Sequence, residues 1–428
     1  MPPRKSMSKA MRRRRAALAR GVPERPQRPP RPPLPTRFKV LASCVVLVVV
    51  LAILETGARI IGPQVPILRD ASQDAEIMIG HPTRLWAMSP GVRRNAGAEA
   101  TIHATGLRGD VPESPRADGE ERVLILGDSS FFGHGVEDDE TLAVYLESAL
   151  GASGRRVEVI NGAIPGYSSE QARAMMDEMG WDLEPTLLVV ALLWSDNTWD
   201  LFRDGDLLRT AAAFHGNPLA ESSFYQLLAG AIDRAKGGTG AQIVTWTRKS
   251  EWPDQGVRRV DVHRFATNLD YLVREGARRG AGVVFLAPAN EEMVNPRRPG
   301  ESFSWTMYFD AQAAIADHHG VPVVPVLPAF RAAYDAAVAS ADGETDPIRT
   351  VFLDKMHPTP AAQRLMATEV AAALDASGWP DAPLMGAPES GFDVSTIPAD
   401  SWGQPPGEVH KTLSPHGRLY SEMPPQYR

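Results

Sequence analysis

The sequence contains one cysteine, Cys44, among its 428 residues, so no disulfide can form within the chain. It also lacks the patterns that hold metals or nucleotides. His318 and His319 have no Asp, Glu or Cys partners at metal-ligand spacing. The glycines from Gly127 to Gly135 match neither a P-loop nor a dinucleotide-binding fingerprint. We therefore expect no metal ion and no cofactor.

Beyond residue 39, basic side chains are far fewer than acidic ones. Residues 1–39 hold 13 Lys and Arg side chains and a single acid, whereas the rest of the chain holds 32 basic and 51 acidic side chains. The net charges of the two parts are therefore +12 and −19. Phosphate binding requires clustered positive charge. The acidic body thus argues against nucleic acid as a partner, and the basic arm needs another role.

An uncharged run follows this arm. Residues 40–54 carry no charge, and as a helix they span only ~22 Å of a membrane core of about 30 Å. Continuing through Glu55 and Arg59, which can pair one turn apart, completes a crossing. A cleaved signal peptide is the alternative, but no Ala-x-Ala-like site follows. We expect residues 40–62 to form a single-pass anchor in the cytoplasmic (inner) membrane, with a cytoplasmic N-terminus and the rest of the chain on the extracytoplasmic side.

Beyond the anchor, short apolar runs bounded by Gly, Pro or Asn alternate with helical patterns. The runs predict strands at residues 122–128, 157–160, 187–193, 282–287 and 321–326, with helices at 138–150 and 169–181. Strands of this kind, separated by helices, are typical of parallel βαβ units. We therefore predict an α/β fold, a three-layer αβα sandwich around a five-stranded parallel sheet.

The composition divides the chain into six parts. They are a basic, Pro- and Arg-rich cytoplasmic tail (1–39), the transmembrane signal anchor (40–62), a juxtamembrane segment (63–121), the α/β domain (122–377), an insertion within it (197–279) and a Pro- and Gly-rich C-terminal tail (378–428). The insertion has helical patches such as residues 223–235 and could cover a site. The C-terminal tail is predicted to be extended or disordered.

Two short motifs carry the chemistry. Gly127-Asp128-Ser129 follows the first predicted strand, where an open α/β sheet presents reactive groups. Asp354 stands three residues before His357 near the end of the predicted domain. A serine hydroxyl needs a general base, and an acid beside the histidine can orient the imidazole. Ser129 is the expected nucleophile, with His357 as base and Asp354 as its partner; Ser130 is the alternative nucleophile.

These motifs, in this order, resemble the SGNH or GDSL-type serine esterases and acyltransferases. The resemblance covers about residues 106–377 and includes Gly106-Leu-Arg-Gly109, which is similar to an entry stretch in many membrane-anchored members. It implies a flavodoxin-like strand order 2-1-3-4-5. It also implies an oxyanion hole made by the N–H of Ser129, a glycine N–H after the second strand, and an Asn side chain after the third. Gly166 is the expected glycine, with Gly162 as the alternative.

The third block departs from the family pattern. Counting from the third strand, Ser195 stands where the family has Asn, and Asn197 follows two residues later. A serine hydroxyl can donate a hydrogen bond, but it is shorter and rotates freely. Asn197 can supply the donor if the loop is locally shifted, and we favour it slightly over Ser195.

The resemblance implies a membrane-anchored serine hydrolase that cleaves an ester through a Ser-His-Asp triad and an acyl-enzyme. The expected substrate is an ester-bearing small molecule, a lipid ester or an O-acylated polysaccharide. Two alternatives remain open. The acyl group could pass to a carbohydrate hydroxyl, which would make the protein an O-acyltransferase of an envelope polysaccharide. The missing motif asparagine could instead mark a catalytically inactive envelope scaffold.

Overall fold

The structure is a computed structural model. It describes residues 9–18, 35–61, 77–112, 115–152, 154–200, 203–216, 218–219, 222–235, 257–295, 305–340, 346–387, 389 and 391–398. The chain divides into two compact units, residues 1–61 and residues 62–428. Most of the predicted Pro- and Arg-rich tail, the start of the predicted juxtamembrane segment and residues 399–428 lie outside the described residues.

The first unit contains two helices, α1 (Lys9–Leu18) and α2 (Thr36–Ile61). The 26 residues of α2 correspond to a length of ~39 Å, more than the ~30 Å of a membrane core. Its most apolar window has a mean hydropathy of 2.5, and none of that window is buried in the protein. The Arg59 Nε and Glu55 Oε1 atoms lie 2.8 Å apart, as the sequence predicts. A helix long and apolar enough to cross a membrane therefore occupies the predicted anchor.

The second unit is built on a five-stranded parallel sheet. Its strands are β5 (Glu121–Gly127), β6 (Val157–Asn161), β7 (Leu187–Ala191), β10 (Gly282–Ala287) and β11 (Val323–Pro325). The spatial order is β6-β5-β7-β10-β11, and all neighbours pair in parallel. This confirms the predicted order 2-1-3-4-5. All residues of β7 are buried, as expected for a central strand covered on both faces.

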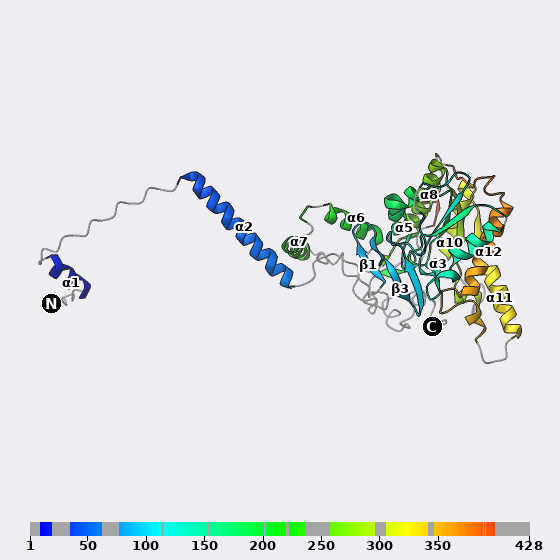
Figure 1. The fold of residues 1–428 in the computed structure, drawn as a ribbon, viewed down its shortest axis with the longest axis horizontal. Helices are drawn as coiled ribbons and strands as arrows, with labels where there is room; N and C mark the ends of the chain where they lie inside the picture. The colour runs from blue at the N-terminus through cyan, green and yellow to red at the C-terminus, as the bar shows by residue number, and fades with distance from the viewer. Residues whose placement is uncertain are drawn as a thin grey trace. The chain divides into compact units, whose positions relative to one another are not determined.

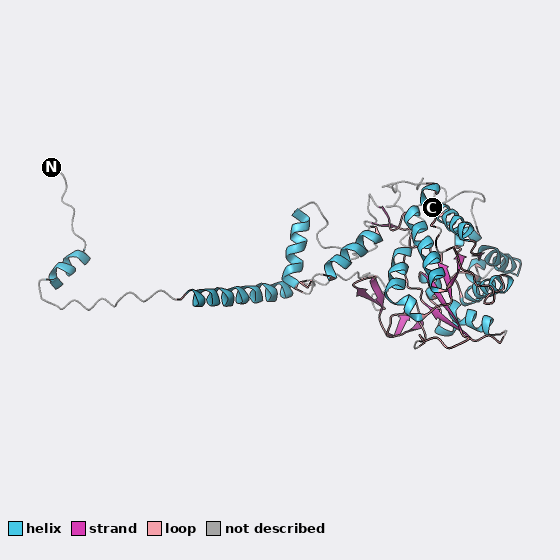
Figure 2. Cartoon of the chain, turned by 90° about the horizontal axis from the view of Figure 1, so that it is seen from above, coloured by secondary structure: helices cyan, strands magenta, loops and turns pink. Residues whose placement is uncertain are grey.

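Helices cover both faces of this sheet (Figures 1 and 2). The helices of the second unit are α3 (Ser129–Phe132), α4 (Leu142–Gly151), α5 (Ser169–Met175), α6 (Asp204–His215), α7 (Ser223–Ala235), α8 (Val262–Arg279), α9 (Glu291–Val294), α10 (Thr306–His319), α11 (Leu327–Ser340) and α12 (Pro360–Ala376). Helices α4 and α12 pack together on one side, and α5, α8 and α10 pack on the other. The result is the predicted three-layer sandwich.

Two antiparallel hairpins precede the sheet in the same compact unit. They are β1 (Met78–His81) with β2 (Leu85–Met88), and β3 (Gly91–Asn95) with β4 (Ala98–Ile102). Every residue of β2 is buried, and so are the alternate residues of β4. The strands are followed by Arg108, which is buried and bridges to Asn161 at the end of β6. The hairpin segment is therefore packed into the domain beside the end of the edge strand β6.

Part of the predicted insertion lies outside the three layers of the sandwich. This part begins at the short strand β8 (Trp199–Asp200) and ends at β9 (Val257–Arg258), which pair with each other. Helices α6 and α7 lie between them in the sequence. The bounds of α7 match the helical patch predicted from the sequence. Residues 262–279, also placed in the insertion, instead form α8 of the sandwich. The described part of the C-terminal tail reaches the start of β10, where the Val283 N–H donates to the Leu384 carbonyl at 2.9 Å.

Candidate active site

Ser129 is the first residue of α3, directly after β5. The Asp128 carboxylate caps this helix and accepts a hydrogen bond from the Ser130 N–H at 3.0 Å. A Cβ atom on Gly127 would lie 2.8 Å from the Cβ of Phe131. Only glycine therefore lets the chain reverse so closely after the strand. The turn leaves Ser129 partly exposed at the C-terminal end of a central parallel strand.

His357 faces Ser129 from the loop before α12. Its Nε2 atom lies 2.8 Å from Ser129 Oγ, and its Nδ1 atom lies 2.6 Å from Asp354 Oδ2. The other oxygen of Asp354 accepts the backbone N–H groups of Met356 and His357, each at 2.9 Å. The structure thus brings together the three residues that the sequence predicts as nucleophile, base and acid, in the order hydroxyl, imidazole, carboxylate.

The loop that carries His357 ends at the start of α12. Thr359 caps α12 by accepting a hydrogen bond from the Ala362 N–H at 3.2 Å, and Pro360 occupies the first helical position. The backbone N–H of Leu353 donates to the His357 carbonyl at 2.8 Å. The acid and the histidine therefore belong to one short loop with internal hydrogen bonds.

Ser130, the alternative nucleophile, points elsewhere. Its hydroxyl donates to the Met356 carbonyl at 3.2 Å, and its side chain is buried. Its own carbonyl accepts a hydrogen bond from Gln363 Nε2 at 2.9 Å. The structure therefore places Ser129, and not Ser130, within hydrogen-bond distance of the imidazole.

The charges at the site favour an ionised Asp354. Partial burial alone would raise the pKa of this carboxyl. The hydrogen bond and charge of His357, together with the two backbone N–H groups, outweigh burial and hold the pKa well below its usual range. An ionised Asp354 keeps the proton of His357 on Nδ1. Nε2 is then left to accept the hydroxyl proton of Ser129.

Asp128 connects the nucleophile turn to the loop after β7. Besides the Ser130 N–H, its carboxylate accepts the backbone N–H of Ser195. Burial raises the pKa of Asp128 to about 6, although both hydrogen bonds and the charges of His357 and Arg259 oppose the rise. Asp128 therefore holds the nucleophile turn by accepting backbone hydrogen bonds.

A second imidazole lies against His357, which the sequence did not predict. The rings of His134 and His357 have centroids 4.2 Å apart and are tilted by 37°. His134 is half-buried, and its backbone N–H donates to the Ser129 carbonyl at 3.0 Å. The only signal for it in the sequence is its place between Gly133 and Gly135, in the loop directly after the predicted nucleophile.

Gly166 follows β6 in a stretch that is otherwise buried. It is the only partly exposed residue between positions 161 and 170. Its φ of 75° lies in the left-handed region that favours glycine. No described residue accepts a hydrogen bond from its N–H. Trp86 holds both neighbours, since its Nε1 donates to the Pro165 carbonyl at 3.0 Å and its carbonyl accepts the Tyr167 hydroxyl at 2.6 Å.

Gly162, the alternative donor, has a packing reason to be glycine. A Cβ atom there would lie 2.8 Å from both the Ile125 carbonyl oxygen and a methyl of Leu124. Gly162 is buried, whereas Gly166 is partly exposed. Gly162 therefore packs on β5, whereas Gly166 has an available N–H.

The two candidates for the third donor have different surroundings. Asn197 is fully buried, and its Oδ1 and its carbonyl oxygen accept hydrogen bonds from Arg258 Nη1 at 2.6 and 2.8 Å. Ser195 is 8% exposed and adjoins the nucleophile turn through the bond from its N–H to Asp128. Among the described residues, the Ser195 hydroxyl has no hydrogen-bond partner. Asn197 is therefore tied to β9, whereas Ser195 borders the turn of Ser129.

Asp196, between these two residues, ties the third loop to α5. Its carboxylate accepts the N–H and the hydroxyl of Ser169, the first residue of α5. Asn268 on α8 also donates to the Ser169 hydroxyl at 2.9 Å. Burial raises the pKa of Asp196 to about 8, against the hydrogen bonds from Ser169 and the charge of Arg259. These hydrogen bonds thereby connect the loop that carries Gly166 to the loop that carries Ser195.

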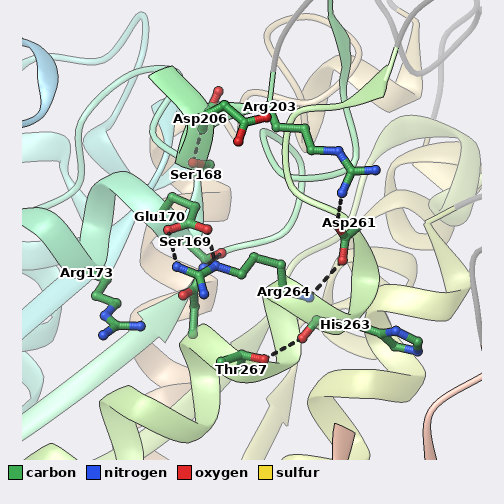
Figure 3. A network of polar contacts seen from close by, with 12 residues as sticks. Ser168, Ser169, Glu170, Arg173, Arg203, Asp206, Asp261, His263, Arg264 and Thr267 are labelled. Carbon is green, nitrogen blue, oxygen red and sulfur yellow. Dashed lines mark hydrogen bonds and ion pairs between the residues drawn. The ribbon is translucent and has the colours of Figure 1, made fainter. Parts of the chain in front are cut away.

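Figure 3 shows the polar contacts that extend from here to the start of α8. Glu170 on α5 pairs with Arg264 on α8, and Arg203 pairs with Asp261, the N-cap residue of α8. Asp261 also accepts the Arg264 N–H at 2.9 Å. These contacts fix α5, the helix that follows the Gly166 turn, against α8.

The arrangement suits a nucleophilic serine that is open to a substrate. Ser129 is partly exposed, and the side chains of His357 and Asp354 are 14% and 50% exposed. Among the described residues, no group of three or more His, Cys, Asp or Glu could hold a metal ion. The contacts from Ser129 through His357 to Asp354 suit proton transfer and covalent catalysis.

Solved structures similar to this one include proteins named as hydrolases and esterases. They include LAE5, an α/β hydrolase from the metagenome of Lake Arreo, Spain (19% identity, 60% of this chain and 95% of that chain, TM-score 0.38). They also include the psychrotrophic esterase EstA from Pseudoalteromonas sp. (18%, 60% and 97%, TM-score 0.33) and the acetyl xylan esterase AlAXEase (13%, 59% and 99%, TM-score 0.38). No family model matches the chain, and no curated protein matches it.

Proposed function

We propose that the protein is a serine hydrolase that cleaves an ester through an acyl-enzyme on Ser129. The observation that carries the proposal is the continuous chain of contacts from Ser129 Oγ through the His357 ring to Asp354, with distances of 2.8 and 2.6 Å. A hydroxyl, an imidazole and an ionised carboxylate in this order are the parts that activate a serine.

In the first half of the reaction, Ser129 Oγ attacks the carbonyl carbon of the ester while His357 Nε2 takes its proton. Asp354 stabilises the imidazolium that forms. The tetrahedral intermediate collapses when the carbon–oxygen bond to the alcohol breaks. The alcohol leaves with the proton from Nε2, and the acyl group remains on Ser129.

In the second half, water replaces the alcohol. His357 Nε2 takes a proton from the water as its oxygen attacks the acyl carbon. The bond to Ser129 Oγ then breaks, and Nε2 returns the proton to Oγ. The products are the acid and the restored enzyme. If a carbohydrate hydroxyl took the place of water, the same steps would make an O-acyltransferase.

The developing oxyanion requires preorganised donors. We assign the backbone N–H groups of Ser129 and Gly166 to this role, because the first begins α3 and the second has no acceptor among the described residues. The contacts favour Ser195 as the third donor, since its hydroxyl is unpaired among those residues and it borders the nucleophile turn. Asn197, which the sequence slightly favours, is fully buried and is held by Arg258 through its Oδ1 and carbonyl oxygen.

We further propose that α2 anchors the enzyme in the cytoplasmic membrane with the catalytic unit outside. The net charge of +12 before residue 40 supports a cytoplasmic N-terminus. The substrate would then be an ester of the cell envelope, either a lipid ester or an O-acyl group on a polysaccharide. Protease added to intact spheroplasts should remove the catalytic unit and spare the basic arm; a protected C-terminal tag would contradict this orientation.

A serine-directed fluorophosphonate probe tests the enzyme directly. The full chain should be labelled, and Ser129→Ala should not be. The matched variant Ser130→Ala should still be labelled, because its hydroxyl bonds to the Met356 carbonyl and does not meet the imidazole. Failure of the wild-type chain to react would favour the inactive scaffold. Product analysis with and without an added sugar would separate hydrolysis from acyl transfer.

A further inference from the structure

The loop directly after the nucleophile helix is held by its backbone carbonyls. This loop, residues 132–136, begins at the last residue of α3 and carries His134. Gly133 caps α3 with a φ of 88°, and its N–H donates to the Ser129 carbonyl. Asn95 on β3 donates to the Gly133 carbonyl at 2.8 Å, and Asn161 donates to the Phe132 carbonyl at 3.2 Å.

Arg108 makes the largest set of contacts with this loop. Its Nη1 donates to the carbonyls of Phe132 and Gly133 at 3.0 and 2.7 Å, and its Nη2 donates to that of Val136 at 2.8 Å. Its Nε donates to Asp138 at 3.0 Å. The side chain is only 2% exposed. Buried charge-assisted hydrogen bonds of this kind hold their acceptors strongly.

Arg108 fits closely against the loop at Gly133 and Phe132. A Cβ atom on Gly133 would lie 2.9 Å from Arg108 Nη1. The guanidinium also lies over the Phe132 ring, 5.0 Å from its centroid. A lysine could not make these forked contacts, because it offers one ammonium group where Arg offers a planar set of five donors. Arg108 therefore determines the path of the loop, and the path determines where His134 lies.

His357 needs support from outside its own loop. Asp354 lies three residues away in the same loop, so their hydrogen bond orients the ring within the loop but does not fix it relative to Ser129. The bond from Ser130 to the Met356 carbonyl is one tie between the two loops. The His134 ring, which packs on the face of His357, is another. The two ring hydrogen bonds of His357 act in the plane of the imidazole, whereas the His134 ring supports it from outside that plane.

We propose that Arg108 and His134 are positioning residues for the reaction. Arg108, from the Gly106-Leu-Arg-Gly109 stretch, fixes residues 132–136 through their carbonyls, and His134 packs on His357 and holds its Nε2 toward Ser129. This inference rests on the proposed function, since it treats His357 as the general base. It gives the hairpin segment before the sheet a direct part in the geometry of the site.

The first test compares His134 variants of the full chain. His134→Ala should lower kcat by about 10- to 100-fold, the cost of a small misplacement of a catalytic group, with KM little changed. His134→Phe should recover most of the loss because it restores a ring face. His103→Ala is the matched control, since His103 is a half-buried histidine of the same unit that bonds to Thr105; it should keep wild-type kcat.

The second test compares two buried arginines. Arg108→Lys should lower kcat by roughly 10-fold or more. Arg122, 1% exposed, also donates to a backbone carbonyl and pairs with Glu158, but it lies at the other end of β5 from Ser129, ~20 Å along the strand. Arg122→Lys should reduce thermal stability to a similar degree and leave the kcat of the folded protein unchanged. Equal kcat for the two variants would overturn the role of Arg108.

A readout independent of turnover separates this inference from the proposed function. The Nδ1 proton of His357, bonded to Asp354 at 2.6 Å, should give a far-downfield proton resonance that His357→Ala removes. His134→Ala should broaden or shift it, and His103→Ala should not. An unchanged resonance together with wild-type kcat would overturn the role of His134. If no probe labels Ser129, the proposed function fails, and the resonance still decides whether His134 positions the ring.

Discussion

The loops after β5 and β7 lie at the same edge of the sheet, but they are held in different ways. The loop after β5 is organised locally, because Asp128 caps the helix that begins at the next residue. The loop after β7 depends on distant residues. Asp128 accepts the N–H of Ser195, and the Ser169 N–H donates to Asp196. Arg258 donates to Asn197.

This difference explains why one loop could be predicted and the other could not. A cap and a tight turn are encoded within a few neighbouring residues, so Gly127-Asp128-Ser129 indicates its own geometry. The backbone and side chains of the loop after β7 are held by partners 27 to 67 positions away. The local sequence therefore does not show whether Ser195 or Asn197 donates to the oxyanion.

The largest expected effect is at the nucleophile in the locally organised loop and at the histidine that faces it. Ser129→Ala and His357→Ala should each lower kcat on a chromogenic short-chain ester by at least ~10⁴-fold, because each removes an essential member of a unit that acts together. The double variant should lose little more than either single variant. Steady-state kinetics on the folded variants measures this. Normal turnover by Ser129→Ala would remove the proposed nucleophile.

The next effect tests the loop after β7. If Ser195 donates to the oxyanion, Ser195→Ala should lower kcat by roughly 10²- to 10³-fold with KM little changed, the cost of one lost donor. Asn197→Ala should act mainly on stability, by about 1–3 kcal/mol, because it leaves buried Arg258 with fewer acceptors. Kinetics and thermal denaturation together separate the two.

The opposite pattern would restore the assignment that the sequence slightly favours. A large loss of kcat in Asn197→Ala, with Ser195→Ala nearly unaffected, would make Asn197 the donor. Ser195→Asn offers a further check, since an amide at this position should raise kcat if the family arrangement suits the pocket. If neither position matters while Ser129 remains essential, the oxyanion is held by backbone N–H groups alone.

In the rest of the fold, too, features set by neighbouring residues were predictable and features set by distant residues were not. The five strands and the cap at Thr359 were predictable because each depends on a short apolar run or on a capping residue beside a proline. The strand order came only with the family resemblance. The packing of β2 against the Gly166 turn could not be predicted, since Trp86 reaches residues about 80 positions away. His134 was missed for the same reason, because its contact with His357 is set by tertiary structure.

A smaller effect is expected where the two loops meet, at Asp128. Asp128→Ala removes the acceptor of two N–H groups, those of Ser130 and Ser195, and should destabilise the protein by about 1–3 kcal/mol. Asp128→Asn keeps one acceptor oxygen and a good capping residue, so most of that stability should remain. Denaturant titration measures both. Equal losses in the two variants would mean that charge, rather than the acceptor, matters at this position.

The smallest effect concerns the pH dependence of stability at Asp196. Burial raises its folded-state pKa to about 8, above the ~3.9 of an unfolded chain. A carboxyl with a raised folded-state pKa contributes most stability below the unfolded value and loses that contribution as pH rises through the folded value. Stability should therefore fall between about pH 4 and pH 8 on account of this group.

Asp196→Asn should reduce this slope, because an amide stays neutral while one oxygen can still accept the Ser169 N–H. Relative to the wild type, the variant should gain thermal stability steadily from pH 5 to pH 8. Asp128, with a pKa raised to about 6, titrates in the same window, so the comparison is best repeated in an Asp128→Asn background. A difference in Tm that stays constant with pH would show that Asp196 keeps its charge in the folded protein, and that its partners around α5 outweigh its burial.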